Sequence, residues 1–504
     1  MSISILAAGV EEKRYFEWFR CRTVKKIPGA FVSPFWDTLL FQASLTEPAV
    51  LHAILTLSSV HKREILSDDS QSRSDDVLDE HEQFMLQHYT KAISHLRPHF
   101  SNKDRSSVRI ALITCVVFIC LEFLRGHFKT AQTHLQNGLK VLREMRSPSS
   151  LNDNGLLFLK PSRESIDDWI GEVFCRLHFQ VVLFEQGYQN PCLIVQDYCG
   201  PEPPIPIYHS FNEAWKQMER ILNKIFYLAK EARQQRVSEC LSLGHTAALL
   251  KQQQHIQAEL IQWLDTYEAS KKDLHHQDPR GLGFRLLYTY HSMANIMAGA
   301  CLRSDDESVF DCYTSQFISL IEQLVNLWKI GSLGDEFLAP PGHCLNMSRS
   351  LVNIGWIPPL YYAALKCRVH RVRLQAIRLL ESTSHREGIW DAKIAACVAR
   401  KVMEMEERNF YRDVEKADDF LLSSSPGLRD LSLPILPQSY RIHEVKVVLP
   451  DGPMDSVLIF CRQNMTSGDW KIISKEYHTL SQCWIDGPTG EDAESAPLVR
   501  LPYF

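Results

Sequence analysis

The sequence lacks two features that would point to a DNA-binding or a membrane protein: an excess of positive charge and a long apolar run. Its formal net charge at pH 7 is -5, whereas nucleic-acid-binding domains usually carry a basic patch that attracts phosphate. The most apolar stretch, residues 110–124, includes Thr114 and Glu122. Because a bilayer span needs about twenty apolar residues, we expect this stretch to be a central core helix and no part of the protein to enter a membrane.

The sequence also lacks a secretory signal and any cysteine pair with C-x2-C spacing. Residues 1–10 carry no basic segment ahead of an apolar one, so we expect no secretion signal. The fourteen cysteines are scattered, and several, such as Cys115 and Cys120, lie inside apolar runs. This pattern is typical of buried, reduced thiols in a reducing compartment.

Helical patterns are what the sequence does contain, from its start to about Glu415. The 504 residues are 45% hydrophobic and 23% charged, as in soluble globular proteins with a large core. In residues 46–62, Pro48 lies in the first turn and Val50, Ile54 and Leu57 recur at helical spacing. Further helices are expected over residues 81–96, 108–124, 129–145, 212–237, 246–270, 283–303, 313–329 and 356–407, with a separate start at Asp391 inside the last range.

Short connections and breaks divide these helices. Residues 108–124 and 129–145 are joined through Gly126, which predicts an antiparallel helical hairpin. Loops are expected over residues 67–79, 147–165, 190–206 and 339–342, where serine, aspartate, proline or glycine accumulate.

The pattern changes after about Lys416. Residues 443–449, 456–461 and 469–477 are short runs rich in Val, Ile and aromatic residues, separated by turn-forming residues. We therefore predict a mainly α fold: a large helical body of stacked antiparallel helical pairs (1–415), a loop (416–440), and a C-terminal element (441–504) with a small three-stranded antiparallel β meander and a tail.

Three stretches together resemble the fungal-specific transcription factor regulatory domain, the helical body that usually follows a two-zinc, six-cysteine DNA-binding cluster. The similarity extends from about Glu11 to Tyr477. Its segments are YFEWFR (15–20) with Phe35-Trp36 and EPAVLHA (47–53), FLRG (123–126), and PPLYYAALKCR (358–368) continuing into REGIWD (386–391).

This resemblance implies a nuclear regulator of metabolic or secondary-metabolite genes, with no catalytic residues and no cofactor. One feature of the family is missing. Its zinc cluster needs C-x2-C-x6-C halves, so that six thiolates hold two zinc ions, but the first cysteine here, Cys21, already lies beside the first motif. We therefore predict a regulator without its own zinc cluster that acts through other transcription factors or the transcription machinery, as a homodimer or heterodimer. Specific DNA binding by this chain alone is not expected.

Two clusters leave alternatives open. His81, His88 and His95 repeat every seven residues, but successive members would lie about 10 Å apart along a helix, too far to share an ion. We therefore expect no structural metal. A second group is strongly basic and would bind nucleic acid, contact a partner protein, or form a solvated or internally paired face. The apolar residues opposite and the acidic residues nearby favour this last interpretation. The group comprises Lys366, Arg368, Arg371, Arg373 and Arg378.

Enzyme motifs are incomplete. Gly281-Leu282-Gly283 lacks the third glycine of a dinucleotide fingerprint, and His81-Glu82 fails the zincin pattern because position 85 is Met. We therefore assign no catalytic, cofactor or metal residues and expect no enzyme activity. The alternatives are a helical scaffold without a nuclear role and an α-helical enzyme with an unrecognised site. Acidic pairs that such an enzyme would use are Asp75-Asp76, Asp167-Asp168, Asp305-Asp306 and Asp418-Asp419.

Overall fold

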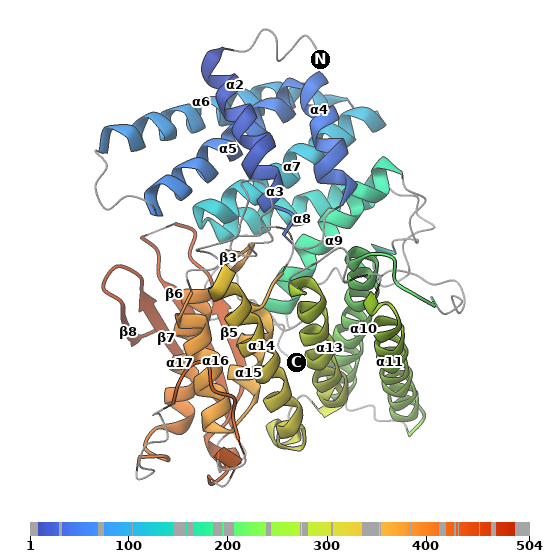
Figure 1. The fold of residues 1–504 in the computed structure, drawn as a ribbon, viewed down its shortest axis with the longest axis vertical. Coiled ribbons are helices and arrows are strands. Elements are labelled where there is room, and N and C mark those ends of the chain that lie inside the picture. Colours follow the sequence, from blue (N-terminus) through green and yellow to red (C-terminus); the bar gives the residue numbers. More distant parts are fainter. Residues whose placement is uncertain are drawn as a thin grey trace.

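The structure is a computed structural model in which helices form two tiers (Figure 1). The N-terminal tier contains α2 to α8, the C-terminal tier contains α10 to α17 with a β sheet along one side, and α9 runs between them. The structure describes residues 9–488 except 30–32, 69–74, 103, 146–156, 159–164, 185–193, 196–205, 238–242, 273, 275–280, 304–305, 335–351, 353, 384–385, 413–419, 428–429, 432, 453 and 465–469.

The N-terminal tier is built from packed helical pairs, as the sequence predicts. Helix α5 packs on α6, and α7 packs on α8. The predicted hairpin is confirmed, since α7 ends at Gly126 in a left-handed conformation (φ 75°) that favours glycine. The tier comprises α2 (Val10–Trp18), η1 (Phe19–Thr23), α3 (Val24–Lys26), η2 (Phe35–Leu39), α4 (Leu40–Thr46), α5 (Pro48–Asp68), α6 (Asp75–Ser101), α7 (Arg105–Arg125) and α8 (Phe128–Met145).

Helix α7 is the central core helix of this tier. By length and composition it is the one described helix that would suffice to cross a membrane, but 78% of its most apolar window is buried inside the protein. The side chain of Asp104 caps its first turn by accepting hydrogen bonds from the backbone of Ser106 and Ser107. The prediction of a core helix over residues 110–124 is thus confirmed.

The C-terminal tier continues the paired arrangement. Helix α10 packs on α11, α13 on α14, and α16 on both α15 and α17. Its elements, with α9, are α9 (Ile166–Phe184), α10 (Phe211–Val237), α11 (Leu243–Ala269), α13 (Leu282–Ala300), η4 (Cys301–Arg303), η5 (Glu307–Tyr313), α14 (Thr314–Gly334), α15 (Ile357–Lys366), α16 (His370–Glu381), β3 (Arg386–Glu387), β4 (Trp390–Asp391) and α17 (Ala392–Glu407).

Two predicted boundaries were wrong. The helix expected over residues 356–407 stops at Lys366 and restarts at His370, before the predicted break near residue 386. Helix α6 begins at Asp75, inside the predicted loop 67–79. Most of the other predicted loops lie outside the described residues, apart from the short parallel pair β1 (Leu157–Phe158) and β2 (Ile194–Val195).

The C-terminal sheet has four antiparallel strands in the order β5-β6-β7-β8, not the three that we predicted. The prediction missed the last strand, which is only four residues long. The strands are, after η7 (Gln438–Tyr440), β5 (Ile442–Val448), β6 (Val457–Asn464), β7 (Trp470–His478) and β8 (Cys483–Asp486).

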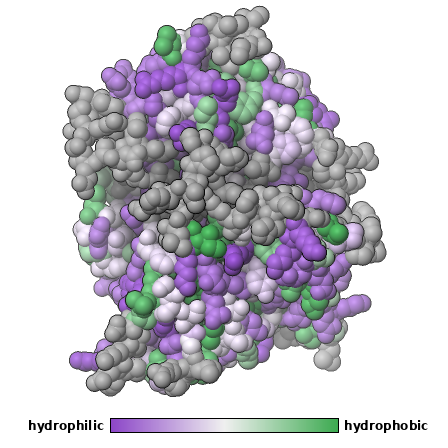
Figure 2. Space-filling view, viewed as in Figure 1, coloured by the Kyte–Doolittle hydropathy of each residue, from purple (hydrophilic) through white to green (hydrophobic). Residues whose placement is uncertain are grey.

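One hydrophobic core joins helices and sheet. The cluster of buried side chains runs from Tyr15 to Cys461, and Ile459 and Cys461 of β6 are fully buried within it. On the face drawn in Figure 2, the described residues are mostly hydrophilic and hydrophobic side chains form small separate spots. The division at residues 415 and 440 stays a prediction.

Candidate functional site

The basic residues of the sequence segment 366–378 enter a buried ionic cluster. We use this name for three cations and three carboxylates brought together by η5, α15, α16, α17 and the link between α15 and α16. The members are Glu307, Lys366, Arg368, Arg373, Glu406 and Glu407.

Two carboxylates bridge the cations of this cluster. Glu307 lies 2.7 Å from Lys366 Nζ and 3.0 Å from the Arg368 guanidinium. Glu406 lies 2.8 Å from Arg368 and 2.6 Å from Arg373, and the side chains of Glu406 and Arg373 are both 0% exposed. Because a buried charge is tolerated only when it is paired and hydrogen-bonded, each charge here depends on its neighbours.

The ionic cluster also explains why the predicted long helix is interrupted. Arg368 donates hydrogen bonds to the carbonyls of Leu365 (2.7 Å) and Lys366 (2.8 Å), at the end of α15. Glu406 accepts a hydrogen bond of 2.6 Å from the backbone N–H of Ile442, the first residue of β5. The cluster therefore closes a helix end and fastens the sheet to α17.

Burial and charge act in opposite directions on Glu406. Burial raises the pKa of its carboxyl, but Arg368 and Arg373 outweigh it and hold this pKa below its usual value. Glu406 is thus ionised in the folded protein at neutral pH.

The remaining basic side chains of the segment are also engaged within the protein. The guanidinium groups of Arg371 and Arg378 lie 3.2 Å and 4.4 Å from the ring centre of Phe420, and Arg371 donates a 2.8 Å hydrogen bond to the Ser424 hydroxyl. The interpretation of an internally paired face agrees with the structure. The alternative of a solvated basic face was wrong, and so was the prediction that these residues lie on one continuous helix.

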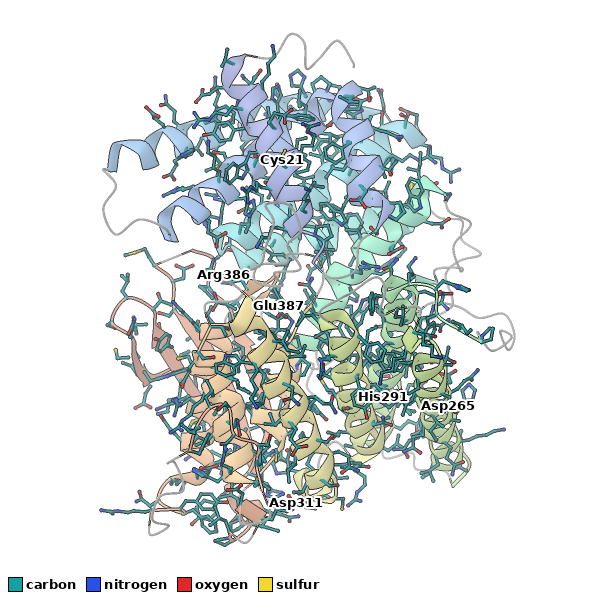
Figure 3. All side chains as sticks on the ribbon, viewed as in Figure 1. Cys21, Asp265, His291, Asp311, Arg386 and Glu387 are labelled. Carbon is teal, nitrogen blue, oxygen red and sulfur yellow. The ribbon has the colours of Figure 1, made fainter. Side chains whose placement is uncertain are left out.

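The REGIWD motif caps α15. The buried carboxylate of Glu387 accepts hydrogen bonds from the backbone N–H groups of Gly355 (2.6 Å), Trp356 (2.9 Å) and Ile357 (3.4 Å). A Cβ at Gly355 would collide with this carboxylate. The capped helix carries the PPLYYAALK motif, so the two parts of the third family-like stretch form one structural unit. Arg386 and Glu387 lie at the end of the C-terminal tier next to the N-terminal tier (Figure 3).

The rest of the REGIWD motif fixes neighbouring elements. Trp390 packs edge-on against Tyr361 of α15, with ring centres 5.5 Å apart. Asp391 accepts backbone hydrogen bonds from Lys393 and Ile394 and so caps α17, as its sequence position predicts. These residues position helices and bring together no catalytic group.

The three periodic histidines do not act together. His81 is hydrogen-bonded to the Tyr15 hydroxyl at 2.5 Å, and His95 stacks on the ring of His52. His88 instead meets His52 and Glu12, whose ligand atoms all lie within 4.8 Å of one another. The sequence gives no indication of this group, because its members belong to three different helices.

The acidic pairs have structural partners where their side chains are described. Asp167 pairs with Arg109 at 2.7 Å and with Arg105, and Asp306 caps η5 through the backbone N–H of Ser308. Asp168 is bound to the Ser165 hydroxyl at 2.5 Å. The side chains of residues 75–76, 305 and 418–419 lie outside the described part of the chain.

A cavity of about 90 Å³ lies between α10, α13 and α15. Most of its walls are apolar, with Arg233 and Lys366 as the charged members. Lys366 is already held by Glu307 at 2.7 Å. The cavity therefore adjoins the ionic cluster through Lys366, and most of its remaining wall is apolar.

Glu219 on α10 has a pH-dependent effect on stability. Burial, followed by repulsion from Glu172, raises its pKa to about 7, against 4.5 for an ordinary glutamate. Between these two pH values the folded state retains a proton that the unfolded state releases, so this group lowers the free energy of unfolding as pH rises from 4.5 to 7. Glu219→Gln should therefore stabilise the protein at pH 8 by about 3 kcal/mol.

Urea unfolding of the Glu219→Gln variant and the parent protein at pH 4.5 and pH 8 measures this effect. The gain in stability should be present at pH 8 and small at pH 4.5. An equal gain at both pH values would show that packing, and not the charge of Glu219, is responsible.

The family follows from comparison with known proteins. The model of the fungal-specific transcription factor domain matches residues 14–304, more than half of the chain. The chain belongs to this family. The matched region covers nearly all of the N-terminal tier and the helices up to α13. It contains His52 and His88 but not Glu12.

Two curated regulators are similar to this family member. The aspercryptin biosynthesis cluster-specific transcription regulator atnN of Emericella nidulans is 22% identical over 469 residues, which cover 79% of this chain and 73% of that protein. The transcription regulator lscL of Purpureocillium lilacinum is 30% identical over 115 residues, 23% of this chain and 27% of that protein. No solved structure is a significant match.

The fungal transcription factor domain and the named relatives make this chain a transcriptional regulator. They also point to a protein that is not an enzyme. The resemblance found in the sequence is thereby confirmed.

Proposed function

We propose that this chain acts in the nucleus and regulates transcription through contacts with other proteins, without reading a DNA sequence itself. Its partners are other transcription factors, including relatives that share the helical body, or the transcription machinery, in a homodimer or heterodimer. The name of the relative atnN supports genes of a biosynthesis cluster as the targets.

The main support for this proposal is the burial of arginines in the basic segment, residues 366–378. Specific DNA recognition needs side chains that reach base edges and a basic surface that positions them on the phosphates. The basic segment 366–378 is engaged internally: Arg368 and Arg373 are 4% and 0% exposed and are paired with carboxylates. The 504 residues also contain no C-x2-C pair for a zinc cluster.

Gel-shift titration at fixed moderate salt tests the DNA part of the proposal. The purified chain should bind fragments from candidate promoters no better than random DNA of the same length. A zinc-cluster regulator purified in the same way serves as the positive control for discrimination. A preference of about a thousandfold, the lower end of specific recognition, would overturn the proposal.

The same gel-shift assay tests the proposed contact with other transcription factors. When the chain is added to a DNA-bound relative with the same helical body, it should change the amount or mobility of that complex. Microscopy of a fluorescently tagged chain should show nuclear enrichment, and exclusion from the nucleus would contradict the proposed location.

A further inference from the structure

Three helices of the N-terminal tier bring two imidazoles and one carboxylate together. Glu12 comes from α2, His52 from α5 and His88 from α6. His52 and His88 face each other, with their Nδ1 atoms 3.0 Å apart, and His88 Nε2 lies 3.7 Å from Glu12 Oε1. The three side chains thus direct polar atoms at one another across three helices, with His88 buried and Glu12 and His52 half-buried.

The surroundings hold these three side chains in place. The other carboxylate oxygen of Glu12 accepts a 3.0 Å hydrogen bond from the backbone N–H of Gly9. The ring of Phe84 stacks on His88 at 4.1 Å between ring centres, and His95 stacks on His52 at 5.5 Å. Supports of this kind orient ligands in metal sites and raise affinity.

The charges around the three side chains also suit a cation. Glu12 supplies a negative charge and is 22% exposed. The neighbouring ammonium of Lys91, 3.8 Å from Glu12, is 40% exposed and is free to turn to water when a cation arrives.

We propose that Glu12, His52 and His88 bind one Zn²⁺ ion, with water in the fourth position. Zinc takes nitrogen and oxygen ligands at about 2.0–2.2 Å in tetrahedral geometry, which places ligand atoms roughly 3.3 Å apart. The three ligand atoms, one from each residue, lie within 4.8 Å of one another, so the side chains must draw closer together to seat the ion.

Such an ion would cross-link α2 and α6 to α5. Helix α5 carries the EPAVLHA segment and packs on both of these helices. Because zinc would bind the folded chain in preference to the unfolded one, it would stabilise the N-terminal tier by mass action. The site is independent of the proposed nuclear role.

Titration of the purified full chain tests the proposal. After treatment with a chelator and its removal, Zn²⁺ should bind with a stoichiometry of one in calorimetry, and Co²⁺ should give the visible absorption of a tetrahedral site. A hundredfold excess of Zn²⁺ over the dissociation constant should raise the Tm of the protein.

Variants identify the ligands. Glu12→Gln keeps an oxygen for the Gly9 N–H but loses the charge, and should weaken Zn²⁺ binding by roughly 10–100-fold or more; His52→Gln should behave alike. His255→Gln, a change at a 71% exposed histidine of α11 in the C-terminal tier, is the matched control and should bind as the parent does. Thermal melts without metal establish that each variant is folded.

Two results would overturn the proposal: no saturable binding by the parent chain, or unchanged affinity in both the Glu12→Gln and His52→Gln variants while these remain folded. Equal loss of binding in His255→Gln would overturn the three-residue ligand set.

Discussion

Glu406→Gln should lower the free energy of unfolding by about 3–5 kcal/mol, the usual cost of removing one partner of a buried ion pair. The variant keeps the shape of the side chain but leaves Arg368 and Arg373 without the carboxylate that bridges them at 2.8 Å and 2.6 Å. Urea unfolding followed by circular dichroism at pH 7 measures the loss.

The exposed pair of Glu381 and Arg400 provides a matched control for this prediction. These side chains are 40% and 36% exposed and lie 2.6 Å apart. Glu381→Gln should cost less than about 1 kcal/mol, because water screens the pair. Similar losses in Glu381→Gln and Glu406→Gln would contradict the role of burial.

The pH dependence of the Glu406 effect follows from its lowered pKa. The stabilisation is fully present above the pKa of an unfolded glutamate, 4.5, and is lost as pH falls through the lower pKa of the folded state. The difference in stability between the parent and Glu406→Gln should therefore shrink when both are unfolded in acid.

Glu387→Ala should destabilise the protein by about 3 kcal/mol or more. The substitution leaves the backbone N–H groups of Gly355, Trp356 and Ile357 without their carboxylate acceptor, and each buried group left unpaired costs about 1–3 kcal/mol. A fall in Tm in differential scanning fluorimetry, with the chain still soluble, is the expected observation.

Asp104→Ala is the comparison for this cap. Asp104 caps α7 through two backbone N–H groups in the same manner, but it does so at an exposed position. Its removal should cause a clearly smaller fall in Tm, since water can replace the lost acceptor. If both variants lose the same stability, burial of the Glu387 cap is not what matters.

Local patterns were enough to predict most of the fold. The helical spacing of Val50, Ile54 and Leu57 and the Gly126 turn indicated α5 and the α7–α8 hairpin, both of which the structure contains. Errors arose where a distant residue decided the local conformation. The end of α15 at Lys366 depends on the Arg368 guanidinium, which is itself held by Glu307 and Glu406.

The candidate site was harder to predict for the same reason. The sequence of a basic segment does not reveal whether water or buried carboxylates surround its side chains. The carboxylate partners of Arg373 lie about thirty residues away along the chain. The group of Glu12, His52 and His88 has no sequence signal of its own, since its members lie on three different helices. The sequence pattern that could be recognised was the periodic set of His81, His88 and His95. It groups His88 with two histidines of its own helix, whereas in the structure His88 lies beside His52 and Glu12.

The hydrogen bond from Ile442 to Glu406 has a practical consequence for dividing this protein into pieces. The sequence pattern predicts a boundary at residue 440. A fragment that ends there would lack Ile442, whose backbone N–H donates a hydrogen bond to the Glu406 carboxylate and whose carbonyl accepts one from Arg368 at 3.2 Å. It would also uncover the core surface on which Ile459 and Cys461 pack. Recombinant fragments, and chimeric proteins made from two relatives, should therefore keep the sheet and α15 to α17 together.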